Sequence, residues 1–529
     1  MTKRFIGLIN PALIMLTFAL SAKANSQELF KFERLGGYHT RRPAFLTIEN
    51  EGEKKNLIIS SFDVPKPGSG DNFLNYINNL TNASNDTVRV IEGMDSFLKQ
   101  GPNQWLETSD DKTLETKSFK FKESSSPLEK CVAKGKIDWP NKTEEVPTSV
   151  AGEKILAVAS GFLTPMRGNG NIYLINSNNR SPLEKGRCAS NPSHYIKLMD
   201  VPLKPSKGIK TWFHKVIWVD MNDDGLLDAV TAYAESKSGL APVVSDYEER
   251  TGLKKPIFGG SSLTGKGFLV WLEQPKDPSW KEPLLTGKGK QVVWKKHLIS
   301  EGPDVNFLFE DINNDGQKEF IATEFFGDDN EGALSVIYKE NGKYQRRLVD
   351  TSVGHGFDLS VADLNNDGNK DILMTNHQPA IGASLKNKVS GRVYAFEVPQ
   401  NLSTGTFKRH ILLDNIPVNK KEMMQDTEMS PGKAIAFYPE LAVKDNKPTI
   451  FVGGDGASEV YILTPKSQDT DSWEYDSTSL YKQYGFDNKK IMSVTGEAVI
   501  DDLNGDGFVE IVIPWYEANY LDIWSISAL

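Results

Sequence analysis

The chain has 529 residues, of which 39% are hydrophobic and 25% charged, and a formal net charge of -9. This composition is typical of a globular protein with a large core, and it excludes a disordered chain. The negative net charge also argues against nucleic acid as a partner.

The first 24 residues have the pattern of a signal peptide. A basic start is followed by an apolar stretch that ends in AKA, a small-residue cleavage signature. A membrane anchor is the alternative, but Asn10 and Pro11 interrupt the stretch, and no later segment approaches the roughly 18 apolar residues that a transmembrane helix needs. We therefore expect residues 25–529 to form one secreted domain, periplasmic or extracellular, without a transmembrane segment.

Strand-like runs recur along the rest of the chain. Residues 28–35 read as a lone strand, residues 44–62 as a first pair of strands, and residues 153–162 as part of a second pair. Hydrophobic residues alternate with period two, and Gly, Pro, Asn and Asp separate the runs. This pattern favours strands over helices.

Four later pairs of strands enclose an acidic turn with the pattern D-x-N-x-D-G-x-x-D/E. They occupy residues 219–230, 310–321, 362–373 and 501–512. A degenerate copy at residues 434–454 keeps both strands but has lost the acidic turn. With the two upstream copies, the repeats number seven.

Each repeat continues into a third strand with an aromatic residue, and several continue into a fourth. Four antiparallel strands are the unit of a propeller blade, so we expect an all-β, seven-bladed β-propeller. The last copy ends after its third strand. We therefore expect residues 28–35 to add its fourth strand and close the ring, which would protect the open edge. The largest insertion, residues 234–265, falls in the third blade.

The acidic turns offer oxygen ligands at alternating positions, as a Ca²⁺ site requires. Positions 1, 3, 5 and 9 supply side-chain oxygens, position 7 supplies a backbone carbonyl, and the glycine at position 6 permits the sharp bend. Ligands without His or Cys favour Ca²⁺ over zinc or copper. The expected ligands of about four structural Ca²⁺ ions are Asp220, Asn222, Asp224, Leu226, Asp228, Asp311, Asn313, Asp315, Gln317, Glu319, Asp363, Asn365, Asp367, Asn369, Asp371, Asp502, Asn504, Asp506, Phe508 and Glu510.

Two other interpretations of these turns were weighed. An EF-hand requires a bidentate Glu at position 12, where the four turns have Thr231, Ala322, Met374 and Ile513. Hairpin turns whose carboxylates face water are the second alternative. They are less favourable because three carboxylates within about 5 Å of one another would repel strongly without a cation.

The acidic turns resemble the FG-GAP/VCBS repeats of integrin α-subunit propellers and of many bacterial secreted proteins. The resemblance implies seven blades and Ca²⁺ binding. It also implies that the metal turns join the first and second strands of a blade on one face. Loops at the opposite ends of these strands then gather around the central channel, where a ligand would bind.

Several rim positions carry polar or aromatic side chains that suit a site. His214, His355 and His377 can act as general bases, and Arg41 and Arg42 can hold an anion. Asp358 and Glu497 share one register, five residues before a turn Asp, and either project into the channel or pair with Lys215 or Lys433. Phe325, Phe326 and Trp515 either stack on sugar rings or pack internally, and Asp455 lies on the same rim. His297 and His410 occupy outer strands and are expected to be structural.

Two functions follow from this face. One is binding of a carbohydrate or an extracellular protein ligand. The other is catalysis by a polysaccharide lyase or sugar dehydratase, a carbon–oxygen lyase that uses a His/Arg/Asp site at the channel mouth. In that case His355, His377 or His214 is the base, with Arg41, Arg42 and Asp358 in support.

The only two cysteines, Cys131 and Cys188, either pair in an oxidising compartment or remain buried thiols.

Overall fold

The computed structural model describes residues 30–62, 86–99, 128–135, 137–161, 169–185, 187–201, 209–237, 264–327, 332–379, 389–418, 429–483 and 493–528. The predicted signal peptide lies outside these residues. No helix within the described ranges is long and apolar enough to cross a membrane.

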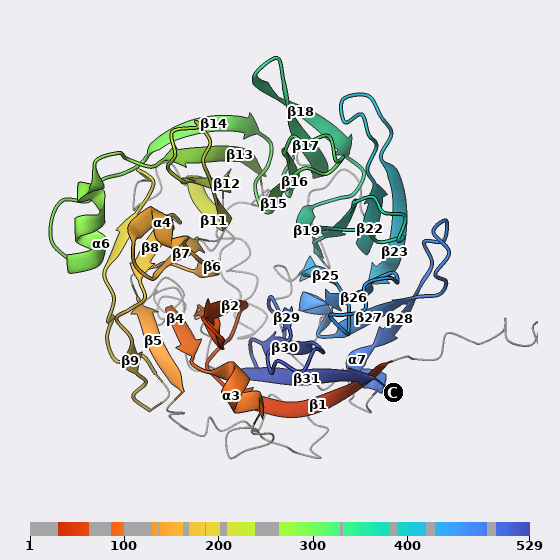
Figure 1. Ribbon diagram of the computed structural model, residues 1–529, viewed down its shortest axis with the longest axis horizontal. Helices are drawn as coiled ribbons and strands as arrows, with labels where there is room; N and C mark the ends of the chain where they lie inside the picture. The colour runs from red at the N-terminus through yellow and green to blue at the C-terminus, as the bar shows by residue number, and fades with distance from the viewer. Residues whose placement is uncertain are drawn as a thin grey trace, which may run out of the picture.

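Seven antiparallel sheets stand around a central axis as the blades of a propeller (Figure 1). This confirms the predicted all-β, seven-bladed fold. In blades 1 to 6 the strands follow one another in chain order from the axis outward, and blade 1 gains the two-residue strand β9 at its outer edge.

Blade 1 has β2 (Phe45–Glu51), β3 (Lys54–Ser61), β4 (Thr87–Ile91), β5 (Glu129–Lys134) and β9 (Ser181–Pro182). Blade 2 has β6 (Pro140–Glu145), β7 (Ile155–Ser160), β8 (Ile172–Asn176) and β10 (Tyr195–Lys197). Blade 3 has β11 (Ile209–Val219), β12 (Asp228–Lys237), β13 (Thr264–Glu273) and β14 (Lys295–Glu301). Those of blades 4 and 5 are β15 (Phe307–Glu310), β16 (Glu319–Glu324), β17 (Ala333–Glu340) and β18 (Lys343–Asp350); and β19 (Gly356–Ala362), β20 (Asp371–Asn376), β22 (Gly391–Glu397) and β23 (Lys408–Ile416). Those of blades 6 and 7 are β25 (Ala434–Phe437), β26 (Thr449–Gly453), β27 (Val460–Pro465) and β28 (Tyr475–Ser479); and β29 (Val499–Asp501), β30 (Glu510–Trp515), β31 (Tyr520–Ala528) and β1 (Phe30–His39).

Short elements connect the blades. The helices are α3 (Met94–Lys99), α4 (Thr148–Ala151), α6 (Glu282–Thr286) and α7 (Leu480–Gln483), with 3₁₀ turns η3 (Pro278–Lys281) and η5 (Asp455–Ala457). Two short strands, β21 (Gln378–Pro379) and β24 (Met429–Ser430), pair with each other between blades 5 and 6.

The core lies between neighbouring blades. The second strands β7, β16, β20, β26 and β30 are buried at every residue. Between blades 2 and 3, Ile172 and Leu174 of β8 share one cluster with Phe213 of β11 and Tyr233 of β12. Because both faces of these strands pack against other sheets, their sequences are nearly continuous apolar runs.

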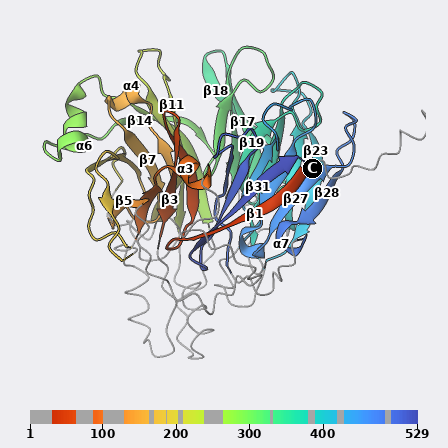
Figure 2. The same ribbon diagram turned by 60° about the horizontal axis from the view of Figure 1, so that its bottom comes forward.

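The strand β1 closes the ring, as predicted. It pairs antiparallel with β31 from Phe30 opposite Ala528 to His39 opposite Tyr520, and Figure 2 shows the two strands side by side at the edge of the last blade. Arg34 Nε of β1 donates to Asp522 Oδ1 at 2.7 Å, and that carboxylate is fully buried. A paired and hydrogen-bonded buried charge fixes the register of the closing strand.

The same carboxylate joins the closing strand to the aromatic core of blade 7. The hydroxyl of Tyr481 and the indole N–H of Trp524 both donate to Asp522 Oδ2, at 2.7 and 2.9 Å. Trp515 Nε1 in turn donates to the Tyr481 hydroxyl at 2.9 Å. Asp522 thus accepts from Arg34 of the closing strand, from Tyr481 of α7 and from Trp524 of its own strand.

Two expectations about connections are also resolved. Cys131 and Cys188 form a disulfide with a Cα–Cα distance of 5.4 Å, which ties β5 to the segment after β9. The predicted insertion 234–265 is shorter than expected, because β12 extends to Lys237 and pairs there with Thr264 at the start of β13. The residues between these two strands lie outside the described ranges.

Candidate functional site

The four acidic turns have one geometry. The carboxylate at position 1 accepts hydrogen bonds from the backbone N–H groups at positions 5 and 6, as Asp363 does from Asp367 at 3.1 Å and from Gly368 at 2.9 Å. The carboxylate at position 5 accepts from the N–H at position 7, as Asp367 does from Asn369 at 2.8 Å. Equivalent bonds recur in the other three turns.

Positive backbone φ angles at two positions of each turn make this bend possible. At position 6 the φ angles of the four glycines lie at 84°, 87°, 87° and 93°, a region that only glycine enters readily. At position 4 the turns have Asp223, Asn314, Asn366 and Gly505, with φ from 57° to 77°. Asn, Asp and Gly are the residues that tolerate this conformation, so the motif encodes the loop shape as well as the oxygen ligands.

The carboxylate at position 9 is electrostatically strained in each turn. Burial raises the pKa of Glu319, Asp371 and Glu510 to about 7, and repulsion from the carboxylates at positions 1 and 5 adds to the shift. The pKa of Asp228 is raised for the same reasons. A cation among these oxygens would remove the strain.

The donor set of these turns suits a hard divalent cation. In the second turn, the buried side-chain oxygen of Asn313 accepts no hydrogen bond within the described part of the chain, as expected of an oxygen that is free to bind a cation. However, no three His, Cys, Asp or Glu side chains in the described ranges are gathered as a preformed metal site. Calcium binding therefore stays a prediction.

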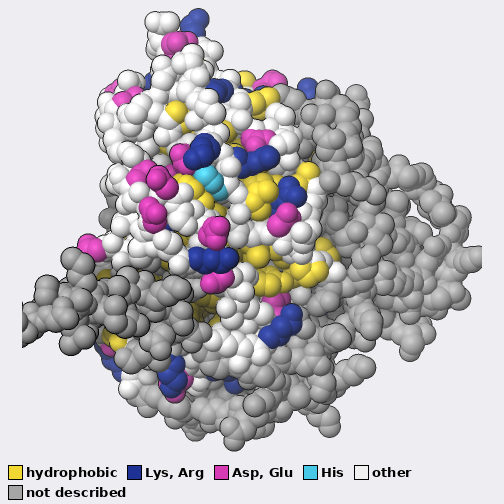
Figure 3. Space-filling model, turned by 90° about the vertical axis from the view of Figure 1, so that its right-hand side faces the viewer, with side chains coloured by type: hydrophobic (Ala, Val, Ile, Leu, Met, Phe, Trp, Pro, Cys, Tyr) yellow, Lys and Arg dark blue, Asp and Glu magenta, His cyan; other side chains and the backbone are white. Residues whose placement is uncertain are grey.

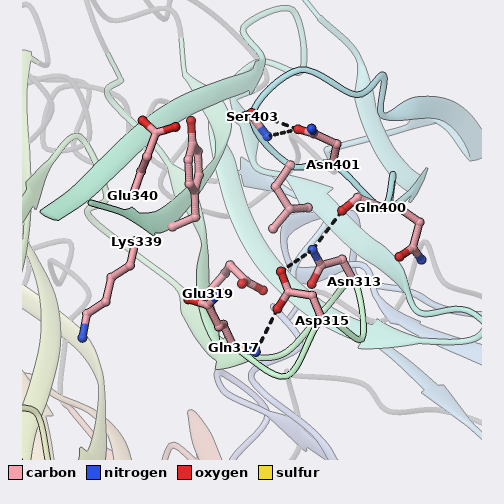
Figure 4. Close-up of a pocket in the computed structure, with 11 residues that line it drawn as sticks. Asn313, Asp315, Gln317, Glu319, Lys339, Glu340, Gln400, Asn401 and Ser403 are labelled. Atoms are coloured by element: carbon pink, nitrogen blue, oxygen red, sulfur yellow. Dashed lines mark hydrogen bonds between the residues drawn. The ribbon is translucent and has the colours of Figure 1, made fainter. Parts of the chain in front are cut away.

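A cavity of about 370 Å³ lies beside this second turn. Figure 4 shows that the turn residues Asn313, Asp315 and Glu319 line it from blade 4, and Gln400 to Ser403 line it from the loop after β22 of blade 5. Asn313 Nδ2 donates to Asp315 Oδ2 and to the carbonyl of Gln400, both at 3.0 Å. The turn thus also contributes to the contact between two blades.

At the other ends of the first strands, charged residues in or directly before these strands contact one another across blades. Glu497 accepts hydrogen bonds from Lys142 of blade 2, at 2.8 Å, and from Lys433 of blade 6. These two lysines hold the pKa of Glu497 well below its usual range, although burial opposes the shift. Of the two interpretations of Glu497, pairing with Lys433 is the one observed.

Asp358 is held by neutral donors. Asn306 Nδ2 donates to Asp358 Oδ1 at 2.6 Å, and the backbone N–H of Ala434 donates to Asp358 Oδ2 at 3.2 Å. Burial raises the pKa of Asp358, while the charge of Lys433 opposes the shift. Asp358 therefore has its carboxylate engaged by neighbouring blades, and it bridges blades 4, 5 and 6.

The three rim histidines converge around buried aromatic rings. His355 stacks on Phe325 with ring centroids 4.2 Å apart, and His377 stacks on Phe357 at 4.1 Å. His214 meets the same Phe357 edge-on at 6.1 Å. Burial lowers the pKa of His214 and His377 to about 4 and also lowers that of His355. All three imidazoles are therefore neutral at pH 7.

His377 is oriented for proton transfer. Its Nδ1 donates to the carbonyl of Pro431 at 2.8 Å, so the unshared electron pair of the neutral ring lies on Nε2. Nε2 is 3.8 Å from Asp455 Oδ2, and both side chains are partly exposed. Burial and the nearby charge of Glu517 raise the pKa of Asp455 well above its usual range. A neutral base thus faces a carboxyl group whose pKa is raised.

Asp455 also adopts an unusual backbone conformation. Its φ is 50°, in the left-handed region that Asp223 of the first acidic turn also adopts. Its N–H donates to Thr495 Oγ1 of the next blade at 2.7 Å, which holds this conformation.

The predicted arginines lie further along the same rim, between blades 1 and 7. Arg42 Nη1 donates to the Tyr516 hydroxyl at 3.2 Å, and its guanidinium lies over the Tyr516 ring. Phe62 contacts the same ring at 4.9 Å and stacks on Trp139 at 3.8 Å. The backbone carbonyl of Arg41 accepts from Ser61. The described contacts of Arg41 and Arg42 are therefore with blades 1 and 7, and the histidine cluster belongs to blades 3 to 6.

Other rim aromatics are packing residues. Phe325, Phe326 and Trp515 are buried, with exposed fractions of 4%, 0% and 0%, so the internal-packing interpretation holds for them.

His297 stacks on Trp271 and pairs with Glu273, and His410 stacks on Trp473 and pairs with Glu397. These matching contacts in two outer strands fit a structural role. On that side of the ring, beyond β23 and β28, Figure 3 shows basic and acidic side chains interspersed.

Sequence reasoning missed two residues of this site. Lys142 escaped notice because blade 2 has no acidic turn from which to count its register. Asp455 was placed on the rim without a role, because the sequence shows neither its φ nor its approach to His377. A Gly-Gly-Asp-Gly stretch directly after a strand was the available signal for an unusual backbone.

No protein-family model matches the chain, and no curated protein matches it. Among solved structures, a rhamnogalacturonan lyase from Bacillus licheniformis is similar over 93% of this chain and 91% of that chain, with 10% sequence identity and a TM-score of 0.27. A likeness this distant concerns the fold alone, and we draw nothing about activity from it. The resemblance to FG-GAP/VCBS repeats stays a prediction.

Proposed function

We propose that the protein is a secreted, calcium-stabilised propeller that binds a carbohydrate at the channel mouth and cleaves it as a carbon–oxygen lyase. One observation carries this proposal: the neutral imidazole of His377 faces the carboxyl group of Asp455, whose pKa is raised, at 3.8 Å, with both groups partly exposed. At this distance the two groups do not hydrogen-bond with each other. Each remains available to a substrate.

The pair supports a β-elimination. His377 Nε2 removes the proton from the carbon next to a carboxylate, and the electron pair of that C–H bond forms a carbon–carbon double bond. The bond from the next carbon to the glycosidic oxygen breaks, and that oxygen takes the proton from Asp455. The products are an unsaturated sugar and a shortened chain, and no oxidant or reductant is needed. General acid and base groups each contribute about 10²- to 10⁴-fold in such steps.

The experiment measures ultraviolet absorbance of unsaturated products from acidic polysaccharides. We expect His377→Ala and Asp455→Asn each to lower the rate at least about 100-fold. His410→Ala is the matched control, since His410 lies in an outer strand, and its rate should not change. Equal rates for His377→Ala and the wild type would exclude this base.

The pH profile tests the same pair. Because the pKa of His377 is about 4, activity should persist at pH 5, where a histidine with an ordinary pKa would already be protonated. Activity should fall as pH rises through the raised pKa of Asp455, where this group loses its proton. An acidic limb near pH 6.5 would contradict the assignment of His377.

Binding without catalysis is the second candidate. It is favoured by the half-buried Phe62, which stacks between Trp139 and Tyr516 beside Arg42, because aromatic rings next to a cation suit a sugar ring. If a glycan array gives a ligand while no polysaccharide yields an unsaturated product, this candidate replaces the lyase. Phe62→Ala should then weaken binding about 10-fold or more.

A further inference from the structure

Lys215 lies on β11 among the charged residues of the channel. It directly follows a β-bulge at His214, where the pairing of β11 with β12 shifts register. A bulge interrupts the alternation of side chains along a strand, so His214 and Lys215 need not point to opposite faces of the sheet. Lys215 is partly exposed.

The carboxylates near Lys215 are engaged elsewhere. Glu497 is bound by Lys142 and Lys433, and Asp358 is bound by Asn306 and the Ala434 N–H. The remaining acidic neighbour, Glu144, lies 3.9 Å from the Lys142 ammonium. The carboxylates near Lys215 also lie near Lys142 and Lys433, and the close contacts are made by Lys142 and Lys433.

Within the described part of the chain, the Lys215 ammonium makes no hydrogen bond and no ion pair with a carboxylate. Its recorded side-chain contact is the ring of Phe307, with the nitrogen 6.0 Å from the ring centroid. Burial lowers the pKa of Lys215 to about 8, and the positive charges of Lys142 and Lys433 add to the shift, although Glu144 and Asp358 oppose it. A largely desolvated cation without a counter-ion attracts an anion.

A second unsatisfied group lies next to it. His214 Nε2 is buried and has no hydrogen-bond partner among the described residues. Burial keeps this imidazole neutral, with a pKa of about 4, so it can bind a hydroxyl group. An ammonium beside an imidazole matches a carboxylate beside a hydroxyl, the arrangement found on a uronic acid ring.

We propose that Lys215 forms an anion subsite in the central channel, which binds the carboxylate of a uronic acid unit, and that His214 binds a hydroxyl of the same unit. This inference rests on the proposed function in one respect: it names the acidic sugar on which His377 and Asp455 would act. The subsite itself depends only on Lys215 and its surroundings.

The test combines calorimetry with lysine labelling. Trisaccharides of galacturonate, glucuronate and mannuronate are titrated beside a neutral galactose trisaccharide and inorganic sulfate. We expect at least one uronate trisaccharide to bind about 10-fold or more tightly than the neutral one, and Lys215→Gln to abolish that difference. Lys215→Arg should retain part of it, because the charge remains. Lys295→Gln, which removes an exposed lysine of β14, is the control and should bind like the wild type.

Labelling of lysines at pH 8 gives a readout independent of catalysis. Lys215 should be modified faster than exposed lysines, because its amine is partly uncharged at this pH, and the uronate should protect it. Equal protection by the neutral trisaccharide, or wild-type affinity in Lys215→Gln, would overturn the subsite. So would the failure of all three uronates to bind, and protection by sulfate alone would assign the site to a sulfate ester instead.

The two proposals fail in different ways. If a uronate binds and protects Lys215 but no unsaturated product forms, the anion subsite stands and the lyase is rejected. If product forms at the wild-type rate and affinity in Lys215→Gln, the lyase stands and the subsite is rejected.

Discussion

Two regions of the propeller solve the same electrostatic problem in different ways. In blades 3, 4, 5 and 7, the turn between the first two strands gathers several carboxylates. Those at positions 1 and 9 accept hydrogen bonds from backbone and amide groups. Among the described residues, no basic side chain is bound to these two carboxylates. In blade 1, the fully buried Glu49 is bound by Arg180 at 2.8 Å and by Lys154 at 3.2 Å.

The comparison shows where the balancing charge comes from. Blade 1 takes it from its own chain, through two basic residues near strands β7 and β9. Among the acidic turns, that of blade 3 has a basic contact, between Lys276 and Asp224 at 3.4 Å, and we propose that a cation from solution balances the remaining charge. On that proposal, stability depends on ion concentration at the acidic turns and not at Glu49.

The largest expected effect is that of chelation on the four acidic turns together. Each ion contributes about 2.7 kcal/mol when free Ca²⁺ exceeds its dissociation constant a hundredfold. Removing all four should lower the melting temperature by roughly ten degrees or more, as measured by calorimetry with and without chelator. An unchanged melting curve, on protein shown to be metal-free, would end the calcium proposal.

The second effect belongs to blade 1. Arg180→Met leaves Glu49 buried beside a single lysine, which should cost about 3 to 5 kcal/mol of unfolding free energy. Denaturant unfolding should give the same loss with calcium and with chelator. The control is Arg187→Met, because Arg187 is exposed and lies seven residues away. A loss of stability that depends on calcium would contradict the view that the Glu49 ion pair is independent of the acidic turns.

A single acidic turn gives a smaller effect. Asp367→Asn removes one ligand charge from the turn of blade 5 and should cost about 2 to 3 kcal/mol in calcium. After chelation, the variant should be as stable as the wild type. Asp471→Asn, at an exposed position of blade 6, is the matched control and should be neutral under both conditions.

The smallest effect concerns the histidine cluster, whose buried imidazoles are neutral. The pKa of His214 is about 4 in the folded protein and about 6.5 in the unfolded chain. Between these values the unfolded chain binds a proton that the folded state does not, so stability falls as pH falls from 6.5 to 4. His214→Gln should reduce this loss by roughly 1 to 3 kcal/mol, measured by urea unfolding at pH 7 and pH 4.5. An unchanged slope would show that His214 is already protonated in the fold.

The fold was predictable because its determinants are local and repeated. The acidic turn recurs four times between apolar runs, and the lone strand at residues 28–35 matches the strand that the last repeat lacks. The limits of the predicted insertion were wrong because β12 and β13 continue beyond the apolar core, into residues such as Ser236 and Lys237 that do not look like strand.

The candidate site was predictable only in part. Counting from the acidic turns placed Asp358 and Glu497 on the channel correctly, since each turn fixes the register of its strand. The same count has no starting point in blade 2, so Lys142 came from the structure, and the approach of Asp455 to His377 is a contact between two blades that a register count does not give. The arginines were grouped with the histidines because both lie on the same rim. The described contacts of Arg41 and Arg42 are with blades 1 and 7, whereas the histidine cluster belongs to blades 3 to 6.

The closure of the ring by β1 also sets an order of events during synthesis. Arg34 and Asp522 are separated by 488 positions. At about 5 to 20 residues per second, Asp522 is made roughly half a minute to a minute and a half after Arg34. Throughout that interval β1 has no sheet to join, although it is the first of the described strands to be completed. This strand is therefore the last of them to find its partner, and the open ring exposes an unpaired edge until β31 has been made.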